Sequence, residues 1–257
     1  MANYSITSLY SGSKGNSVLI ESENAKILID AGKSARALCN ALNDLGKSID
    51  EIDAIFITHE HTDHIGSLEV LLKKHKIPVH MVYVSAQKMM NRGLWDSSDC
   101  IVQHPPCYTL DVGNMTVTSF DTPHDSEYSV GYVIKIGDVK IGYATDIGCV
   151  TNEIKSALVG CESVVIECNH DVQMLMDGPY PYDLKLRISS NRGHLSNEDC
   201  ASLASELCLK GTNNLLLAHL SEENNDPSLA FDEVFSAIGN ENINIKVASQ
   251  YEAVKLV

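Results

Sequence analysis

The sequence predicts a layered α/β fold with mixed sheets, and two features of its 257 residues predict it. Short apolar runs rich in Val, Ile and Tyr recur along the chain, and they have the length and composition of β-strands. Segments with helical periodicity lie between some of these runs. Because the strands come first in hairpin-like clusters and the helices are interspersed later, we expect mixed rather than purely parallel sheets.

The expected elements are spread over the whole chain. The strands are Tyr4–Leu9, Ser17–Ile20, Lys26–Ile29, Ala54–Ile57, Val79–Val84, Met115–Phe120, Tyr128–Ile136, Val139–Tyr143, Ser163–Ile166, Leu215–Leu217 and Ile243–Val247. The helices are Ser34–Leu45, Ser67–His75, Ser196–Cys208 and Pro227–Ile238. Helix ends are marked by Asp226 as an N-cap, by Ser196 and Asp199 in the pattern of a capping box, and by Gly46 and Gly239 after the last turn.

The composition is that of an ordinary globular protein. Hydrophobic residues make up 44% of the chain and charged residues 21%, and no Pro/Gly-rich linker interrupts it, so we expect residues 1–257 to form a single domain. We find neither a long apolar run nor a signal-peptide pattern, which favours a cytoplasmic protein with no membrane partner. The eight cysteines form no C-x-x-C pair and are expected to be reduced thiols.

The formal net charge of −15 limits the kind of partner that the chain can bind. It excludes a uniformly basic face for nucleic acid, and it repels polyanions at long range. Two bound divalent cations would return four positive charges at one place. The acidic balance is therefore compatible with a phosphate-containing substrate, provided that local positive charge attracts it.

The strongest chemical signal is the segment Thr58–His64, which directly follows an expected strand and has the sequence THEHTDH. Neutral imidazole is a good donor to divalent metals, and carboxylate is a hard anionic ligand. A turn that leaves a strand can aim His59 and His61 in one direction, and it can aim Asp63 and His64 in another. The segment therefore predicts two adjacent metal ions.

Further side chains of the ligand type follow expected strands elsewhere in the chain. His124 comes after Met115–Phe120, Asp146 comes after Val139–Tyr143, and His219 comes after Leu215–Leu217. Loops at strand ends commonly build functional sites. Together with the first segment, these residues form a coherent set of metal ligands.

With this set the chain resembles the metallo-β-lactamase superfamily. The resemblance lies in the H-x-H-x-D-H run, in the later His, Asp and His, and in the early motif Leu28–Gly32. It implies a four-layer αββα sandwich with the metals at one edge of two facing sheets. It also implies that Asp146 bridges two metals and that Asp30 orients ligands without binding metal. The implied ligands are His59, His61 and His124 for the first metal, and Asp63, His64 and His219 for the second.

Additional motifs resemble the YycJ/WalJ branch of this superfamily. They are Ser11–Asn16, Glu167–Asp171, Arg192–Asp199 and Ala218–Ser221. The resemblance implies a metal-dependent phosphodiesterase that acts as a 5′–3′ exonuclease on single- or double-stranded DNA. The stretch Gly193–Ser196 also resembles the one that carries a catalytic His in ribonuclease Z relatives.

The expected mechanism is attack on phosphorus by a hydroxide that bridges the two metals. His194 is the expected general acid with Glu167 as its partner, and Asp63 completes the catalytic candidates. The helix that begins near Ser196 would lower the pKa of His194, so that a nearby carboxylate or the phosphate would have to keep it protonated. His-rich ligation suits zinc, while the carboxylates also suit manganese or iron.

Other functions are compatible with the same scaffold. The main alternative is a glyoxalase-II-like hydrolase of small thioesters or lactones. A redox or regulatory metal-binding protein would not need His194 and Glu167, and β-lactam hydrolysis does not fit a chain without an export signal. A generic phosphodiester and a thioester would distinguish the first two activities.

Several residues have two readings from sequence alone. The Ser11–Asn16 loop could bind phosphate through backbone N–H groups or serve as a tight turn. The basic residues Lys185, Arg187 and Arg192 could contact phosphate or form a solvated helix face. His170 could contact substrate or be a buried hydrogen-bonded residue, and Cys168 is expected to be a buried thiol. The histidines His75, His80 and His104 lack ligand-like surroundings.

Overall fold

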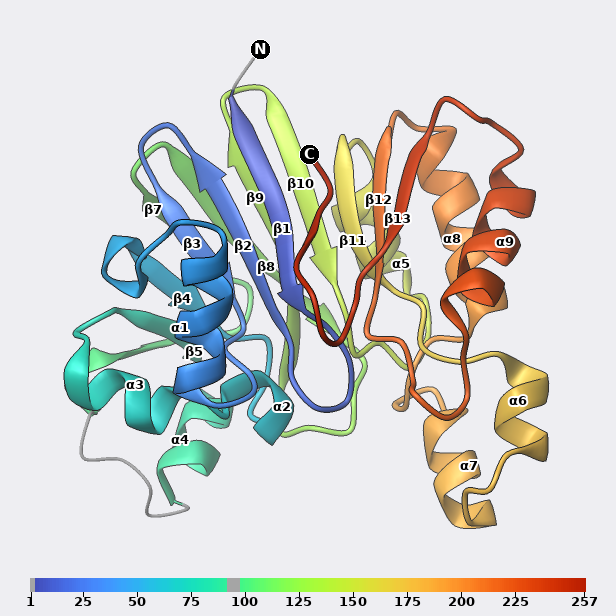
Figure 1. Cartoon of the computed structure of the whole chain (residues 1–257), viewed down its shortest axis with the longest axis horizontal. Coiled ribbons are helices and arrows are strands. Elements are labelled where there is room, and N and C mark those ends of the chain that lie inside the picture. The colour runs from blue at the N-terminus through green and yellow to red at the C-terminus, as the bar shows by residue number, and fades with distance from the viewer. Residues whose placement is uncertain (1–2, 92–97) are drawn as a thin grey trace.

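The computed structural model describes residues 3–91 and 98–257. Within these residues, two mixed sheets of seven strands each face one another (Figure 1). The first sheet has the order β14 (Val254–Lys255), β1 (Tyr4–Tyr10), β2 (Ser17–Ser22), β3 (Lys26–Ile29), β4 (Ala54–Phe56), β5 (Val79–Val82) and β6 (Ile101–His104). The second has the order β13 (Asn244–Val247), β12 (Asn214–Ala218), β11 (Ser163–Glu167), β10 (Val139–Ala144), β9 (Ser129–Ile136), β8 (Met115–Thr122) and β7 (Thr109–Val112).

Each sheet combines antiparallel and parallel pairing, as the order of the elements predicted. Strands β1 to β3 pair antiparallel and β3 to β6 pair parallel. In the second sheet, β7 to β10 are antiparallel and β10 to β13 are parallel. Neighbouring parallel strands end at the same edge of a sheet, so the residues that follow β3 and β4, and those that follow β10, β11 and β12, are brought together.

Helices cover the outer faces of both sheets and complete the four-layer αββα sandwich (Figure 1). The first sheet carries α1 (Ala35–Asp44), α3 (Leu68–Lys74) and α4 (Tyr83–Asn91), and the second carries α5 (Asn152–Leu158), α8 (Asn197–Cys208) and α9 (Pro227–Ile238). The short elements are α2 (Thr62–Ile65), α6 (Val172–Asp177), α7 (Tyr182–Ile188), η1 (Ile49–Glu51) and η2 (Ser98–Cys100). Among the described helices, none has the length and apolar character needed to span a bilayer.

Three apolar cores hold these layers together, and successive residues of one strand contribute to different cores. Ile27 and Ile29 of β3 pack between the two sheets, while Leu28 packs under the helices of the first sheet. Leu216 of β12 likewise faces the first sheet, and its neighbour Leu215 faces the outer helices. Strands that are buried on both faces have continuous apolar sequences. This arrangement explains why the central strands could be predicted from composition.

Four expected strands were too long, three of them by one residue, and several elements were not expected. The strand predicted over Val79–Val84 ends at Val82, and α4 begins at Tyr83. Ala86 and Met89 of α4 are buried three residues apart, which is helical spacing. The unpredicted strands β6, β7 and β14 lie at or near sheet edges and are only partly buried, so they lack a continuous apolar run. Helices α5, α6 and α7 were also not predicted.

The ends of α9 lie where the sequence predicted them. The Asp226 carboxylate accepts a hydrogen bond from the Ser228 backbone N–H at 2.8 Å, Pro227 occupies the first turn, and Gly239 has a left-handed φ of 60°. A side-chain acceptor at the N-cap satisfies one of the N–H groups that the first turn of a helix leaves unpaired.

We predict that Asp226→Ala lowers the free energy of unfolding by about 1 kcal/mol, because the first turn of α9 loses its cap. The measurement is urea denaturation of the two proteins. Asp232→Ala, on an exposed face of the same helix, is the matched control and should leave the denaturation midpoint almost unchanged. Equal midpoints for both variants would show that the cap contributes nothing.

Candidate metal centre

The side chains predicted as metal ligands meet at one end of the sandwich, at the carboxyl ends of strands from both sheets. The segment between β4 and α2 supplies His59 and His61, and α2 itself supplies Asp63 and His64. The second sheet supplies the remaining three, which are His124 after β8, Asp146 after β10 and His219 after β12. The site therefore lies across the joint between the two sheets.

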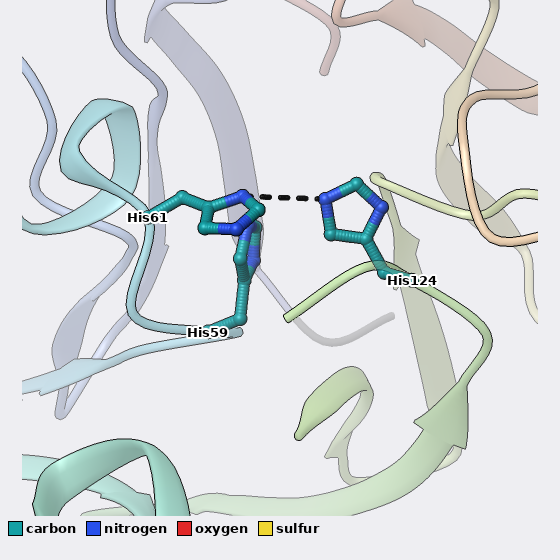
Figure 2. Close-up of side chains that lie close together, drawn as sticks. All are labelled: His59, His61 and His124. Carbon is teal, nitrogen blue, oxygen red and sulfur yellow. Dashed lines mark hydrogen bonds between the residues drawn. The ribbon is translucent and has the colours of Figure 1, made fainter. Parts of the chain in front are cut away.

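Three imidazoles form the first cluster. His59, His61 and His124 each place one ring nitrogen within 4.8 Å of the others, and Figure 2 shows His124 facing the two histidines of the first sheet. His61 Nδ1 and His124 Nε2 are 3.4 Å apart. Nε2 of the buried His59 has no hydrogen-bond partner among the described residues. Burial and the neighbouring His64 hold the pKa of His59 far below its usual value, so its ring is a neutral donor suited to a metal ion.

Two imidazoles and two carboxylates form the second cluster. His64 Nε2 lies 3.2 Å from Asp63 Oδ2 and 3.3 Å from Asp146 Oδ2. His219 Nε2 lies 3.4 Å from Asp146 Oδ1, and that same oxygen is 3.8 Å from His124 Nε2 of the first cluster. The Asp146 carboxylate thus stands between the clusters. This is the position that a bridging ligand would occupy.

The carboxylates of the second cluster favour a positive charge next to them. Burial disfavours the charged imidazole of His219, but Asp146, Asp63 and Glu167 outweigh it and raise the pKa of His219 to about 10. Buried carboxylates that lie this close together need a cation beside them, and either a protonated imidazole or a divalent metal ion can be that cation. The donor sets of both clusters therefore fit metal ions.

Asp30 supports the second cluster from behind. Its buried carboxylate contacts His64 Nδ1 at 2.8 Å and accepts hydrogen bonds from the backbone N–H of Thr58 at 2.9 Å and from the Thr58 hydroxyl at 3.0 Å. These contacts turn His64 so that its Nε2 faces Asp63 and Asp146. Asp30 therefore orients His64, one of the candidate ligands.

The Ser11–Asn16 loop also supports the cluster, through contacts with Asp63 and His219 that the sequence did not predict. The Asn16 amide donates to Asp63 Oδ2 at 3.3 Å, and Ser11 Oγ accepts from the His219 backbone N–H at 2.8 Å. The end of the loop packs closely against Gly32, on which a Cβ would lie 2.5 Å from the Asn16 backbone nitrogen. The sequence identifies the loop as a motif, but only the fold brings it into contact with Asp63. Of the two interpretations of the loop, these contacts support the tight turn, which here holds neighbouring residues in position.

Backbone strain is concentrated at the site. Asp30, Asp146 and His219 have φ values of 63°, 55° and 59°, and only two other non-glycine residues of the described chain have a positive φ. This left-handed conformation costs about 1 kcal/mol or more for such residues and persists where the surroundings enforce it. Each of the three follows a strand of the interior, so the chain turns sharply and presents the side chain to the cluster.

His194 and Glu167 form a hydrogen-bonded pair beside the clusters. His194 Nδ1 lies 2.7 Å from Glu167 Oε1, and the other carboxylate oxygen accepts backbone N–H groups of Ile147 and Leu195. Burial lowers the pKa of His194, but the charge of Glu167 outweighs burial and leaves the pKa above its usual value. The expected depression by the helix end is thus overcome. Asp146, Glu167, His194 and His219 also form a third group that could hold a metal, so His194 has two readings from geometry.

The basic residues near His194 are engaged by the protein. Arg192 donates to the carbonyl oxygen of His124 from two nitrogens, at 2.9 and 2.8 Å, and to that of Ser126 at 3.3 Å. Arg187 pairs with Asp125, and the Lys185 ammonium donates to the Met176 carbonyl. Arg192 therefore fastens the loop that carries His124.

The remaining histidines lie outside the clusters. His80 and His104 contact each other, with ring nitrogens 2.9 Å apart, and His75 contacts Asp50. His170 is buried and its pKa is lowered to about 4, chiefly by burial. The buried Cys168 thiol donates to Asn197 Oδ1, which agrees with the expected buried thiol.

We predict that Arg192→Ala lowers the affinity for Zn²⁺ about 10–100-fold, because residues that orient a ligand have effects of this size. Competition with a chelating dye measures the affinity. Lys185→Ala removes the same charge from the neighbouring helix without touching His124, and it should bind zinc like the parent. Parental affinity in a folded Arg192→Ala protein would contradict the role given to this arginine.

Comparisons with known proteins identify the family. The model of the metallo-beta-lactamase superfamily matches residues 11–203. The chain is 33% identical to the exodeoxyribonuclease YycJ of Bacillus anthracis over 86% of this chain and 84% of that protein. It is also 33% identical to the exodeoxyribonuclease WalJ of Streptococcus pneumoniae, over 95% of this chain and 91% of that protein.

Solved structures agree on the fold. The metallo-beta-lactamase fold protein YhfI from Bacillus subtilis superposes with a TM-score of 0.74 at 17% identity, covering 99% of this chain and 100% of that one. Zinc-bound PqqB from Methylobacterium extorquens also gives 0.74, at 16% identity and with the same coverage. The sandwich, the family model and the two near-full-length relatives lead to one conclusion: the chain belongs to the metallo-β-lactamase superfamily.

Proposed function

We propose that the protein is a metal-dependent phosphodiesterase that removes nucleotides from the 5′ end of DNA. The observation that carries this proposal is the His194–Glu167 pair, hydrogen-bonded at 2.7 Å and placed beside the two clusters. Hydrolysis of a phosphodiester needs a proton donor for its leaving oxygen, and this pair supplies one. The two relatives named as exodeoxyribonucleases, which cover most of the chain, support DNA as the substrate and the exonuclease activity.

Two divalent ions fit the donor sets. His59, His61 and His124 would hold the first ion, Asp63, His64 and His219 would hold the second, and Asp146 would contact both. When bound, such ions would supply an activated water and a Lewis acid for the phosphate oxygens. The predominance of imidazole favours zinc, and the carboxylates also suit manganese or iron. The apolar core between the sheets supports treating the described residues as a single domain.

The residues of the chain itself hold and move the proton. Glu167 is buried and accepts two backbone N–H groups, which fix its carboxylate in place. Burial raises the pKa of Glu167, but the charge of His194 and its hydrogen bond reverse this and lower it to about 2. Glu167 therefore stays ionised and favours the protonated form of His194 by raising its pKa. The imidazolium of His194 can then protonate the leaving oxygen as the phosphorus–oxygen bond breaks.

The experiment that tests the function is digestion of end-labelled single- and double-stranded DNA by zinc- or manganese-loaded protein. We expect stepwise release of nucleotides from the 5′ end. Asp146→Ala is the control and should abolish release, because its carboxylate stands between the clusters. No cleavage by protein shown to hold two ions would refute the proposal and direct the search to thioesters and lactones.

We predict that His194→Ala lowers turnover on DNA about 10²–10⁴-fold, the usual contribution of a general acid. Its metal content, measured by plasma emission, should stay equal to that of the parent. His170→Ala is a suitable comparison, since His170 is buried but lies in none of the clusters. Loss of one ion from His194→Ala would make His194 a ligand instead of the acid.

A further inference from the structure

A pocket of about 190 Å³ adjoins the candidate metal centre at His194. One wall consists of Tyr180, Leu184 and Ile188, from α7 and the turn before it. Ser13 of the Ser11–Asn16 loop, Asn169 and Ser221 contribute neutral polar groups to the lining, and the paired side chains of Asp125 and Arg187 contribute charged ones. The side chains of the first and second clusters do not line the pocket as described, so it extends away from the metal centre.

The chemistry of the lining fits a nucleoside. A nucleobase has flat apolar faces, which can pack against an aromatic ring and aliphatic side chains. Its edges and its sugar carry hydrogen-bonding groups, which the serine hydroxyls and the side-chain oxygen of Asn169 can pair, whereas the Asn169 amide nitrogen already donates to the His219 carbonyl at 2.8 Å. The volume lies below the roughly 300–1,000 Å³ of pockets for drug-sized ligands. The pocket therefore suits one nucleoside and not a run of nucleotides.

We propose that this pocket binds the 5′-terminal nucleoside of the strand, the one whose 3′ oxygen is the leaving group. This inference rests on the proposed function and deepens it. In hydrolysis the oxygen of water bonds to phosphorus and the bond from phosphorus to the 3′ oxygen breaks. The electron pair of that bond stays on the 3′ oxygen, which receives its proton from His194. The products are the released terminal nucleotide with a 3′ hydroxyl and a shortened strand with a 5′ phosphate.

The placement of His194 decides which fragment occupies the pocket. The attacking and leaving oxygens lie on opposite sides of phosphorus in an in-line displacement. His194 protonates the leaving oxygen, so that oxygen lies on the His194 side of the phosphorus atom. The pocket begins at the same side chain, and the fragment attached to the leaving oxygen extends into it. The retained strand then lies on the opposite side and runs outward.

Helix α7 offers a matched pair of positions for the test. Leu184 and Ile188 are four residues apart and both line the pocket, so they lie on one face of the helix. Leu186 lies outside the lining, and its side chain is 48% exposed. The helix has no buried residue, so substitutions at either leucine leave the apolar cores intact.

The experiment is calorimetric titration of the zinc-loaded protein with thymidine 5′-monophosphate and, separately, with inorganic phosphate. Leu184→Trp fills the pocket and should weaken the nucleotide about tenfold or more. Inorganic phosphate needs no nucleoside pocket, and its affinity should not change. Leu186→Trp should bind both probes like the parent, and thermal melts establish that both variants are folded.

The outcomes separate this inference from the proposed function. Parental nucleotide affinity in Leu184→Trp, or an equal loss for nucleotide and phosphate, would overturn the assignment of the pocket. The titration involves no turnover, so selective loss of the nucleotide supports the pocket even in a protein that does not digest DNA. Digestion of DNA by the parent together with an unaffected Leu184→Trp protein would refute the pocket and leave the function standing.

Discussion

The burial of three carboxylates at the joint between the sheets is the constraint on which the site depends. Asp30, Asp146 and Glu167 are each at most 1% exposed. Removing a carboxylate from water is costly unless a cation or hydrogen bonds replace the lost hydration. Asp30 has Thr58 and His64, and Glu167 has His194 and two backbone N–H groups. Asp146 faces imidazoles of both clusters, so positive charge between the clusters must offset the hydration that its carboxylate loses on burial.

The parts of the molecule that follow from local chemistry could be predicted from the sequence. Strand β3 and helix α9 have the predicted bounds, because apolar composition and caps act within a few residues. The ligand-type side chains could be identified because each follows an apolar strand. Their meeting was predictable only through the resemblance, since the convergence of His61, His124 and His219 is a property of the two sheets and not of any single segment.

The parts that depend on packing between distant segments could not be predicted. Asn16 and Asp63 are far apart in the chain, and no pattern in either segment indicates their contact. Arg192 was read as a phosphate contact or a solvated residue, whereas it binds the carbonyl of His124. In helix α7 the apolar residues Leu184, Leu186 and Ile188 alternate with charged ones, a pattern with the period of a strand, so the sequence did not indicate a helix there. Its value to the site comes from the pocket wall that it forms.

Because the clusters draw on both sheets, an ion bound there acts as a cross-link. An ion in the first cluster would join His61 to His124, and an ion in the second would join Asp63 to His219, which are far apart in the unfolded chain. An ion that binds only the folded state stabilises it by about 4 kcal/mol when its free concentration is a thousand times its dissociation constant. The concentration of free metal would therefore affect how stably the two sheets stay packed together, as well as the reaction at the site.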